Sequence, residues 1–134
     1  MNAPETIAIL DFGSQYGQLI ARRVREHQVF SELLPHDTPL ETLQKMNLKG
    51  IILSGGPASV YEADAPTCTR ELFDLDVPVL GICYGMQIGC NLLGAEVVTA
   101  SSREYGSTKL QLTESDTLMA HLSGEKIVWM SHGD

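Results

Sequence analysis

Residues 79–90 read VLGICYGMQIGC, an apolar run that stops at a glycine-flanked cysteine and then continues with helical spacing. Gly81 and Gly85 stand two residues on either side of Cys83. This is the pattern of a sharp strand-to-helix turn that exposes a nucleophile. In parallel α/β sheets, functional groups gather where strands end and helices begin. We therefore predict that a strand and a helix meet at Cys83 and that its thiol is functional.

The same alternation of strand and helix fills the first 93 residues. The predicted strands are continuous apolar runs, as expected where both faces of a sheet are covered. The pattern predicts an α/β fold, a flavodoxin-like parallel sheet with helices on both faces and right-handed connections. The expected strands cover 6–11, 29–34, 50–54 and 77–82, and the expected helices cover 16–27, 38–46, 66–74 and 84–93.

The second of these helices carries recognisable start signals. Thr38 is of a type that caps helices, Pro39 suits the first helical position, and Glu41 is spaced to close a capping box. We therefore expect the helix to begin at Pro39, with the Thr38 side chain as its cap.

The pattern of predicted strands and helices changes after Gly94. Strands are expected over 96–100, 107–113 and 126–131, with a short helix over 116–122. These strands would pair as an antiparallel extension of the fold. The chain ends in WMSHGD, at the mouth of a predicted strand, so we expect it to be cut rather than finished.

Composition limits the classes of function. The chain has 134 residues, enough for one domain with a core, and its 43% hydrophobic and 19% charged residues indicate a globular protein. A net charge of −8 argues against binding to a nucleic-acid backbone. The sequence carries neither an apolar run of membrane-spanning length nor the pattern of a secretory signal. Its three cysteines are odd in number and suit a reducing compartment, so a cytoplasmic enzyme or binding domain is expected.

The setting of Cys83 predicts thiolate chemistry. A helix that begins directly after it would turn free N–H groups and the positive end of its dipole toward the sulfur. The same amides could stabilise an oxyanion once the sulfur has attacked a carbonyl. The competing interpretation is a buried cysteine that acts as a small hydrophobic residue. Cys68 and Cys90 lack this setting, and we expect both to be packed; the cysteine spacing does not suggest zinc.

A glycine-rich loop could complete the site. Ser54-Gly55-Gly56-Pro57 follows another predicted strand, and its glycines would let the backbone approach a ligand closely. In a parallel sheet this loop could lie beside the Cys83 turn and supply an amide donor. An ordinary turn is the alternative.

Acyl transfer by a thiolate also needs a base. The histidines are His27, His36, His121 and His132. The first three are expected at the surface. His132 follows a predicted strand and could come near the site, but its spacing does not show that it reaches Cys83.

Four motifs resemble those of the class I (triad) glutamine amidotransferases. GICYGMQ and the upstream SGGP are similar to the nucleophile turn and the glycine loop of that family. ILDFGSQYGQLIARRVRE and VWMSHGD narrow the resemblance to the branch whose ammonia aminates XMP to GMP in purine biosynthesis. The resemblance covers essentially the whole chain, with its motifs in the family's order.

The resemblance implies a role for each matching residue. Cys83 would attack the side-chain amide of glutamine, expel ammonia and leave a glutamyl thioester that water hydrolyses. The backbone amides of Gly56 and Tyr84 would form the oxyanion hole. The glutamine substrate would be held by Gly55, Gln87, Ser131 and His132. No metal site is implied in this chain.

The resemblance also implies parts that residues 1–134 lack. The chain would be a class I amidotransferase domain that is incomplete at its C-terminal end, without cofactor of its own. The nucleotide-binding domain, which uses ATP and Mg²⁺ on XMP, and the dimerisation segment would lie elsewhere in a homodimeric ligase. The triad base and acid come from a His-Pro-Glu segment that this sequence does not contain. We therefore expect the isolated chain not to be a competent glutaminase.

Three rival interpretations remain. One is a glutaminase that serves another acceptor, as in anthranilate or carbamoyl phosphate synthesis. The second is the related family of cysteine hydrolases and chaperones, in which a histidine usually follows the cysteine in place of Tyr84. The third is a non-catalytic, flavodoxin-like binding module in which Cys83 only packs. Labelling of Cys83 by a glutamine analogue would separate these.

Overall fold

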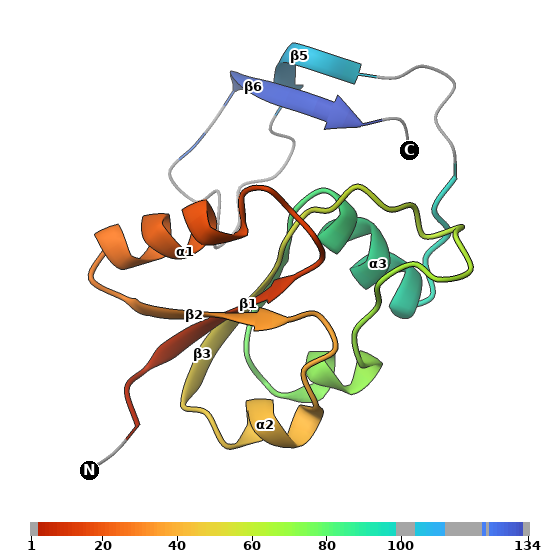
Figure 1. The fold of residues 1–134 in the computed structure, drawn as a ribbon. Helices are drawn as coiled ribbons and strands as arrows, with labels where there is room; N and C mark the ends of the chain where they lie inside the picture. Colours follow the sequence, from red (N-terminus) through yellow and green to blue (C-terminus); the bar gives the residue numbers. More distant parts are fainter. Residues whose placement is uncertain (1–2, 99–103, 112–121, 123, 133–134) are drawn as a thin grey trace. The chain divides into compact units, whose positions relative to one another are not determined.

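The computed structural model describes residues 3–98, 104–111, 122 and 124–132 (Figure 1). The chain divides into two compact units, Met1–Val97 and Val98–Asp134, and each is described by itself. Among the described residues, no helix is both long and apolar enough to cross a membrane.

The first unit is a parallel sheet of four strands in the order β2-β1-β3-β4, with helices in the connections. Strand β1 is central and pairs in parallel with both β2 and β3. The predicted α/β fold is confirmed. Its elements are β1 (Thr6–Asp11), α1 (Gly17–Glu26), β2 (Phe30–Pro35), α2 (Leu40–Gln44), β3 (Leu48–Leu53), the 3₁₀ helix η1 (Arg70–Asp74), β4 (Val79–Gly81) and α3 (Tyr84–Leu92).

The central strand is buried on both faces because helices cover both sides of the sheet. Ala8, Ile9 and Leu10 of β1 are fully buried. Figure 1 shows α1 and α2 on opposite sides of the sheet. One core cluster joins Ala8 and Leu10 to residues of α2, η1 and α3, which places these three elements on one face. The apolar runs of the sequence thus become strands that are shielded from water on both sides.

The start of α2 differs from its prediction. The helix begins at Leu40, Pro39 occupies the N-cap position with extended dihedral angles, and no side chain caps the helix. The Thr38 hydroxyl instead donates a hydrogen bond to the carbonyl of Pro35 at 2.7 Å. Thr38 therefore closes the turn after β2, and the predicted capping box is wrong. A hydroxyl can bond to nearby backbone in either way, and the local pattern does not choose between them.

The helix before β4 is also shorter than predicted. Only residues 70–74 of the expected helix over 66–74 are helical, and they form a 3₁₀ helix. Its Leu72 is fully buried in the core cluster.

The second unit is an antiparallel hairpin of β5 (Glu104–Gln111) and β6 (Glu125–His132). This confirms the predicted antiparallel pairing, but as a separate two-stranded sheet. Lys109 and Glu125 on the paired strands form a salt bridge of 3.7 Å. The strand expected over 96–100 is wrong for 96–98, which are irregular, and the helix expected over 116–122 lies outside the described residues except at Leu122.

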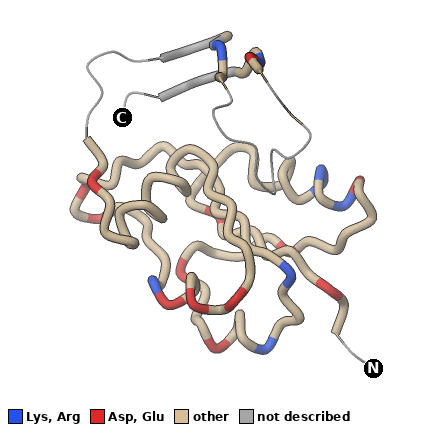
Figure 2. Tube along the Cα trace, turned by 180° about the vertical axis from the view of Figure 1, so that it is seen from behind, with Lys and Arg blue, Asp and Glu red and all other residues tan. Residues whose placement is uncertain are grey.

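Charged side chains of both signs are distributed over the first unit. Figure 2 shows the lysines and arginines of this unit interspersed with carboxylates. In α1, for example, Arg23 pairs with Glu26 at 3.1 Å. This distribution suits a globular surface better than a track for a polyanion.

Candidate functional site

Cys83 lies at the junction of β4 and α3, where the sequence places it. It is the N-cap residue of α3, with φ 51° and ψ −116°. A positive φ is unusual for a residue with a side chain, and such a conformation costs about 1–3 kcal/mol when the fold imposes it. The side chain is exposed. The turn therefore holds a thiol at the surface in a backbone conformation that it would not adopt alone.

The flanking glycines are required by close backbone contacts. A β-carbon on Gly81 would lie 2.5 Å from Cα of Met86, and one on Gly85 would lie 2.2 Å from the carbonyl oxygen of Leu53. The turn is also hydrogen-bonded to β3, because the N–H of Ile82 donates to the carbonyl of Leu53 at 3.0 Å. The predicted reason for these glycines, a turn too tight for side chains, is confirmed.

The amides at the start of α3 divide into two groups. Those of Met86 and Gln87 donate to the carbonyl of Cys83, at 3.0 and 3.1 Å. In the described part of the chain no acceptor pairs with the N–H of Tyr84. This amide follows the thiol directly and can donate to a ligand.

The glycine loop after β3 lies beside the thiol, as predicted. A β-carbon on Gly55 would be 3.4 Å from Cβ of Cys83. A β-carbon on Gly56 would be 2.2 Å from the carbonyl oxygen of Phe12, so only glycine fits there. The N–H of Gly56, like that of Tyr84, has no acceptor among the residues that the structure describes. Cys83 thus has the Tyr84 amide directly after it in the chain, and the Gly55–Gly56 loop lies against its Cβ.

An aromatic cluster supports these loops. The ring of Phe12 packs against the rings of Tyr84 and His36, each with a centroid separation of 5.6 Å. The Tyr84 hydroxyl donates to the carbonyl of Pro66, and burial raises the pKa of this phenol. The cluster joins the loop after β1 to the start of α3. Sequence reasoning did not single out Phe12, although it lies in the DFGSQY motif.

The remaining predicted substrate residues fall in two places. Gln87 is half-buried in the first turn of α3, about one turn after Cys83. Ser131 and His132 lie in β6, opposite Tyr105 and Glu104. These two belong to the second unit. Their placement at the glutamine site stays a prediction.

The other two cysteines differ from each other. Cys68 is buried as expected, and burial raises the pKa of its thiol to about 11. Cys90 is exposed, so its predicted packing is wrong. The reason is helical geometry: Cys90 lies one turn after Met86, which is 52% exposed, so both residues lie on the open face of α3.

The first unit contains two histidines, His27 and His36. His27 is exposed at the C-terminal end of α1. His36 is half-buried in a turn, and its Nδ1 lies 2.8 Å from the carbonyl oxygen of Thr67. His121 lies outside the described residues. No group of three or more histidine, cysteine, aspartate or glutamate side chains in the described ranges is placed to hold a metal ion.

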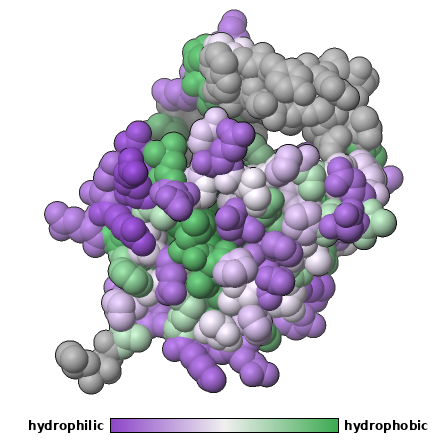
Figure 3. Space-filling model, in the orientation of Figure 1, coloured by the Kyte–Doolittle hydropathy of each residue, from purple (hydrophilic) through white to green (hydrophobic). Residues whose placement is uncertain are grey.

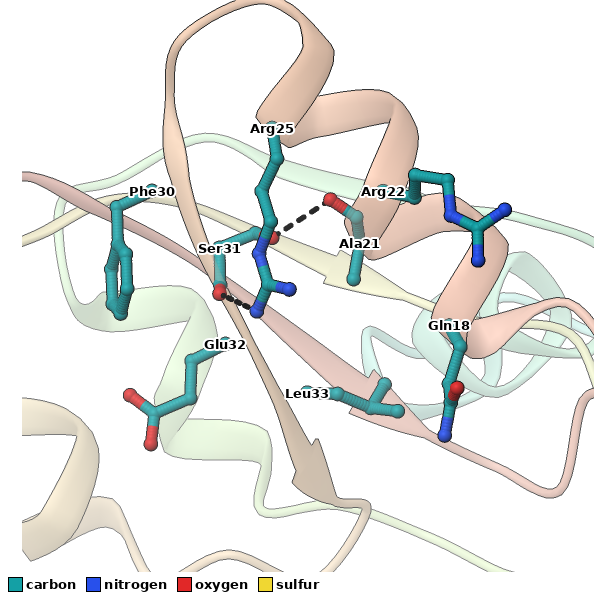
Figure 4. A pocket seen from close by; sticks show the side chains of 8 residues that line it. All are labelled: Gln18, Ala21, Arg22, Arg25, Phe30, Ser31, Glu32 and Leu33. Atoms are coloured by element: carbon teal, nitrogen blue, oxygen red, sulfur yellow. Dashed lines mark hydrogen bonds between the residues drawn. The ribbon is translucent and has the colours of Figure 1, made fainter.

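A hollow of about 550 Å³ lies between α1 and β2 and contains none of the predicted site residues. Arg25 spans it and donates to the carbonyl of Ser31 at 2.9 Å (Figure 4). Figure 3 shows hydrophobic surface in the region of α1 and β2, where Phe30 is 48% exposed. The hollow is lined by no cysteine, so it is separate from the thiol chemistry. Its lining consists of Gln18, Ala21, Arg22, Arg25, Phe30, Ser31, Glu32 and Leu33.

Comparison with known proteins identifies the family. Residues 8–134 match the model of the family "Glutamine amidotransferase class-I". The chain is 55% identical over 130 residues to "GMP synthase [glutamine-hydrolyzing]" of Bacillus subtilis, and 53% identical over 133 residues to the protein of the same name from Streptomyces coelicolor. These matches cover 97% and 98% of this chain but 25% of each relative. The chain therefore spans about a quarter of the length of the curated relatives it matches.

Two solved structures share the fold. A putative GMP synthase subunit from Thermoplasma acidophilum superposes with a TM-score of 0.83 and 29% identity, over 99% of this chain and 67% of that one. A glutamine amidotransferase from Thermotoga maritima gives a TM-score of 0.67 at 20% identity, over 99% and 62%. The second likeness shows the fold alone.

Proposed function

Because the chain belongs to the class I glutamine amidotransferase family, we propose that it is the glutaminase part of an enzyme that makes GMP. The observation that carries this proposal is the exposed Cys83 thiol at a strained turn, with the Gly55–Gly56 loop against its Cβ and the Tyr84 amide directly after it. Curated relatives named GMP synthase [glutamine-hydrolyzing] match nearly the whole chain and support the choice of acceptor.

The proposed reaction is acyl transfer to sulfur. The Cys83 thiolate attacks the side-chain amide carbon of glutamine, and the negative charge that develops on oxygen is held by the N–H groups of Gly56 and Tyr84. The carbon–nitrogen bond breaks, nitrogen takes up a proton and ammonia leaves, so that a glutamyl thioester remains. Water then attacks the thioester, releasing glutamate and restoring the thiol.

The amino-acid end of glutamine would contact Gly55, Gln87, Ser131 and His132. Gly55 supports this role because it lies against Cβ of Cys83. Gln87 lies on the first turn of the helix that Cys83 introduces. The base that removes the thiol proton, and the acid that orients it, would come from a His-Pro-Glu segment outside residues 1–134.

The acceptor chemistry would take place in a nucleotide-binding domain of the same protein. There ATP and Mg²⁺ would activate XMP as an adenylate, and ammonia would displace AMP to give GMP. The complete protein would be a cytoplasmic homodimer. The length of the relatives, of which this chain spans about a quarter, supports the presence of such further domains.

Active-site labelling tests the glutaminase assignment in this chain. A chloroketone with the glutamine skeleton should alkylate Cys83, and free glutamine should protect it, because the two compete for one site. Asparagine, whose side chain is shorter by a methylene, should protect less. Equal labelling of the exposed Cys90, or no protection by glutamine, would overturn the assignment and favour the non-catalytic binding module.

A second experiment tests the acceptor in the complete protein that contains this domain. Cys83→Ala should abolish GMP formation from XMP with glutamine and leave formation with added ammonia, because only the first route needs the thiol. Failure to aminate XMP with either nitrogen source would favour another acceptor.

A further inference from the structure

We infer that Ser54 is a positioning residue, whose buried hydroxyl fixes the Gly55–Gly56 peptide so that its N–H faces the reacting oxygen. The inference rests on the proposed function, in which the Gly56 amide stabilises the oxyanion beside Cys83. It adds a residue that acts through this amide and touches neither the thiol nor the substrate.

The buried Ser54 hydroxyl has one hydrogen-bond donor and one acceptor as partners, both of them backbone groups of the protein. Ser54 is 0% exposed, and its own N–H donates to the carbonyl of Leu10 at 3.0 Å. Its Oγ accepts a hydrogen bond from the N–H of Phe12 at 3.0 Å. The single hydroxyl hydrogen is therefore directed to the other partner, the carbonyl oxygen of Gly55, also at 3.0 Å. A hydroxyl with one donor and one acceptor partner has a defined orientation.

Peptide geometry transmits this orientation to the amide of Gly56. The peptide unit is planar and trans, so the carbonyl of Gly55 and the N–H of Gly56 point in opposite directions. The carbonyl points to the buried hydroxyl, and the N–H must therefore point away from it. If the peptide turned over, a carbonyl oxygen would face the site and repel the oxyanion.

A constraint of this kind is needed because the peptide lies between two glycines. Glycine adopts positive and negative φ with similar ease, so sequence alone leaves this peptide free to turn over. Close contacts hold its ends, since Gly55 abuts Cβ of Cys83 and Gly56 abuts the carbonyl of Phe12. Neither of these contacts involves the carbonyl oxygen of Gly55. That oxygen is held by the hydrogen bond from the Ser54 hydroxyl.

A purely structural hydroxyl would have a different consequence. If Ser54 served only to satisfy the buried N–H of Phe12, its loss would lower stability without changing the kind of reaction that Cys83 supports. If it orients the Gly56 amide, its loss should slow reactions that pass through an oxyanion and spare those that do not. Two probes of the same sulfur separate these cases.

The experiment uses the 134-residue chain with p-nitrophenyl acetate and with iodoacetamide. Acetylation of Cys83 by the ester passes through a tetrahedral oxyanion, whereas alkylation by iodoacetamide is a direct displacement without one. Ser54→Ala should slow acetylation by about tenfold or more, since loss of an oxyanion donor costs up to about 10²–10³ in rate. Alkylation should stay within about twofold, because the thiol itself is unchanged.

Ser31→Ala is the matched control. Ser31 is also 0% exposed, and its hydroxyl donates to the carbonyl of Ala21 at 2.9 Å, between β2 and α1. It should lower stability by a similar amount while leaving the ratio of acetylation to alkylation unchanged. Cys83→Ala defines the reaction at the other thiols for both probes.

The outcomes are distinguishable. An unchanged ratio in Ser54→Ala overturns the inference and leaves the proposed function standing. Absence of Cys83-dependent acetylation in the unaltered chain also overturns the inference, whereas the proposed function is judged separately, by whether free glutamine protects Cys83 from the chloroketone. Should urea titration show that Ser54→Ala does not fold, Ser54→Cys takes its place, because a thiol keeps the shape and donates weakly; an unchanged ratio there also overturns the inference.

Discussion

Gly85 of α3 lies so close to Leu53 of β3 that a β-carbon on Gly85 would be 2.2 Å from the carbonyl oxygen of Leu53. The same carbonyl accepts the hydrogen bond from Ile82 that fixes the strand end before Cys83. The turn that carries Cys83 is thus built directly against the neighbouring strand. Any atom added at this contact must move the helix or the strand.

We predict that Gly85→Ala lowers the free energy of unfolding by about 3 kcal/mol or more, because the new methyl group overlaps backbone atoms that cannot rotate away. Gly89→Ala in the same helix is the control. Its β-carbon would meet the nearest atom, Cζ of Phe73, at an ordinary 3.4 Å. Alanine there should stabilise by about 0.5–1 kcal/mol through helix propensity. Urea titration of both variants measures the difference, and equal effects would contradict the contact.

We predict that Cys83→Gly is more stable than Cys83→Ala by about 1 kcal/mol. Both remove the thiol, but only glycine accepts φ 51° without strain. Thermal or urea unfolding of the two variants tests this. A more stable alanine variant would show that the turn is not strained.

A third prediction concerns pH and Cys68. Burial raises the pKa of this thiol to about 11 from 9.0, so the folded state retains a proton that the unfolded state loses. The contribution is fully present below pH 9, and the free energy of unfolding should fall by about 2 kcal/mol as pH rises toward 11. Cys68→Ala should lack this part of the alkaline decrease, as urea titrations at pH 8 and pH 10.5 would measure. The Cys68 thiolate also contributes to the raised pKa of Tyr84, so Cys68→Ala removes that contribution as well, and parallel decreases in the two proteins would contradict the prediction.

Alkylation of the three thiols should follow their placement. In folded protein at neutral pH we expect Cys68 to react slowest, since it is buried, whereas Cys83 and Cys90 are exposed. Cys83 should exceed Cys90 because it lies at the N-terminal end of α3, where the helix dipole stabilises negative charge. Peptide mapping after brief iodoacetamide treatment gives the order. Faster reaction at Cys90 would contradict the role of the helix end, and in urea the three rates should converge.

Much of the fold could be predicted from local patterns. Apolar runs and helical spacing placed all four parallel strands, and β1 matches its prediction at both ends. Hydrophobic periodicity is a local property, so it can be recognised without knowing which strands and helices pack against one another. The predictions failed where one residue type can take either of two structural roles. Thr38 donates a hydrogen bond to the carbonyl of Pro35 instead of capping α2, and Cys90 is exposed instead of packed.

The strand-to-helix turn at Cys83 and the family could also be predicted from the sequence. GICYGMQ placed Cys83, Gly81 and Gly85, and the resemblance to class I glutamine amidotransferases is confirmed by the family match over residues 8–134. The domain boundaries, and the catalytic and binding roles predicted for Cys83, Gly55, Gly56, Tyr84, Gln87, Ser131 and His132, stay predictions. A motif reveals such a turn because its glycines are required by sterics within a few residues.

Only the tertiary structure revealed the hydrogen bonds of Ser54, which we infer to orient the Gly56 amide. Ser54 and Phe12 are separated by 42 positions, and their hydrogen bond joins loops that the sheet brings together. A hydroxyl at a strand end has no local signature of its distant partner. The sequence spacing thus predicts the position of the Cys83 thiol at the end of a strand. The orientation of the backbone N–H donors near it depends instead on contacts between strands that meet only after the chain has folded.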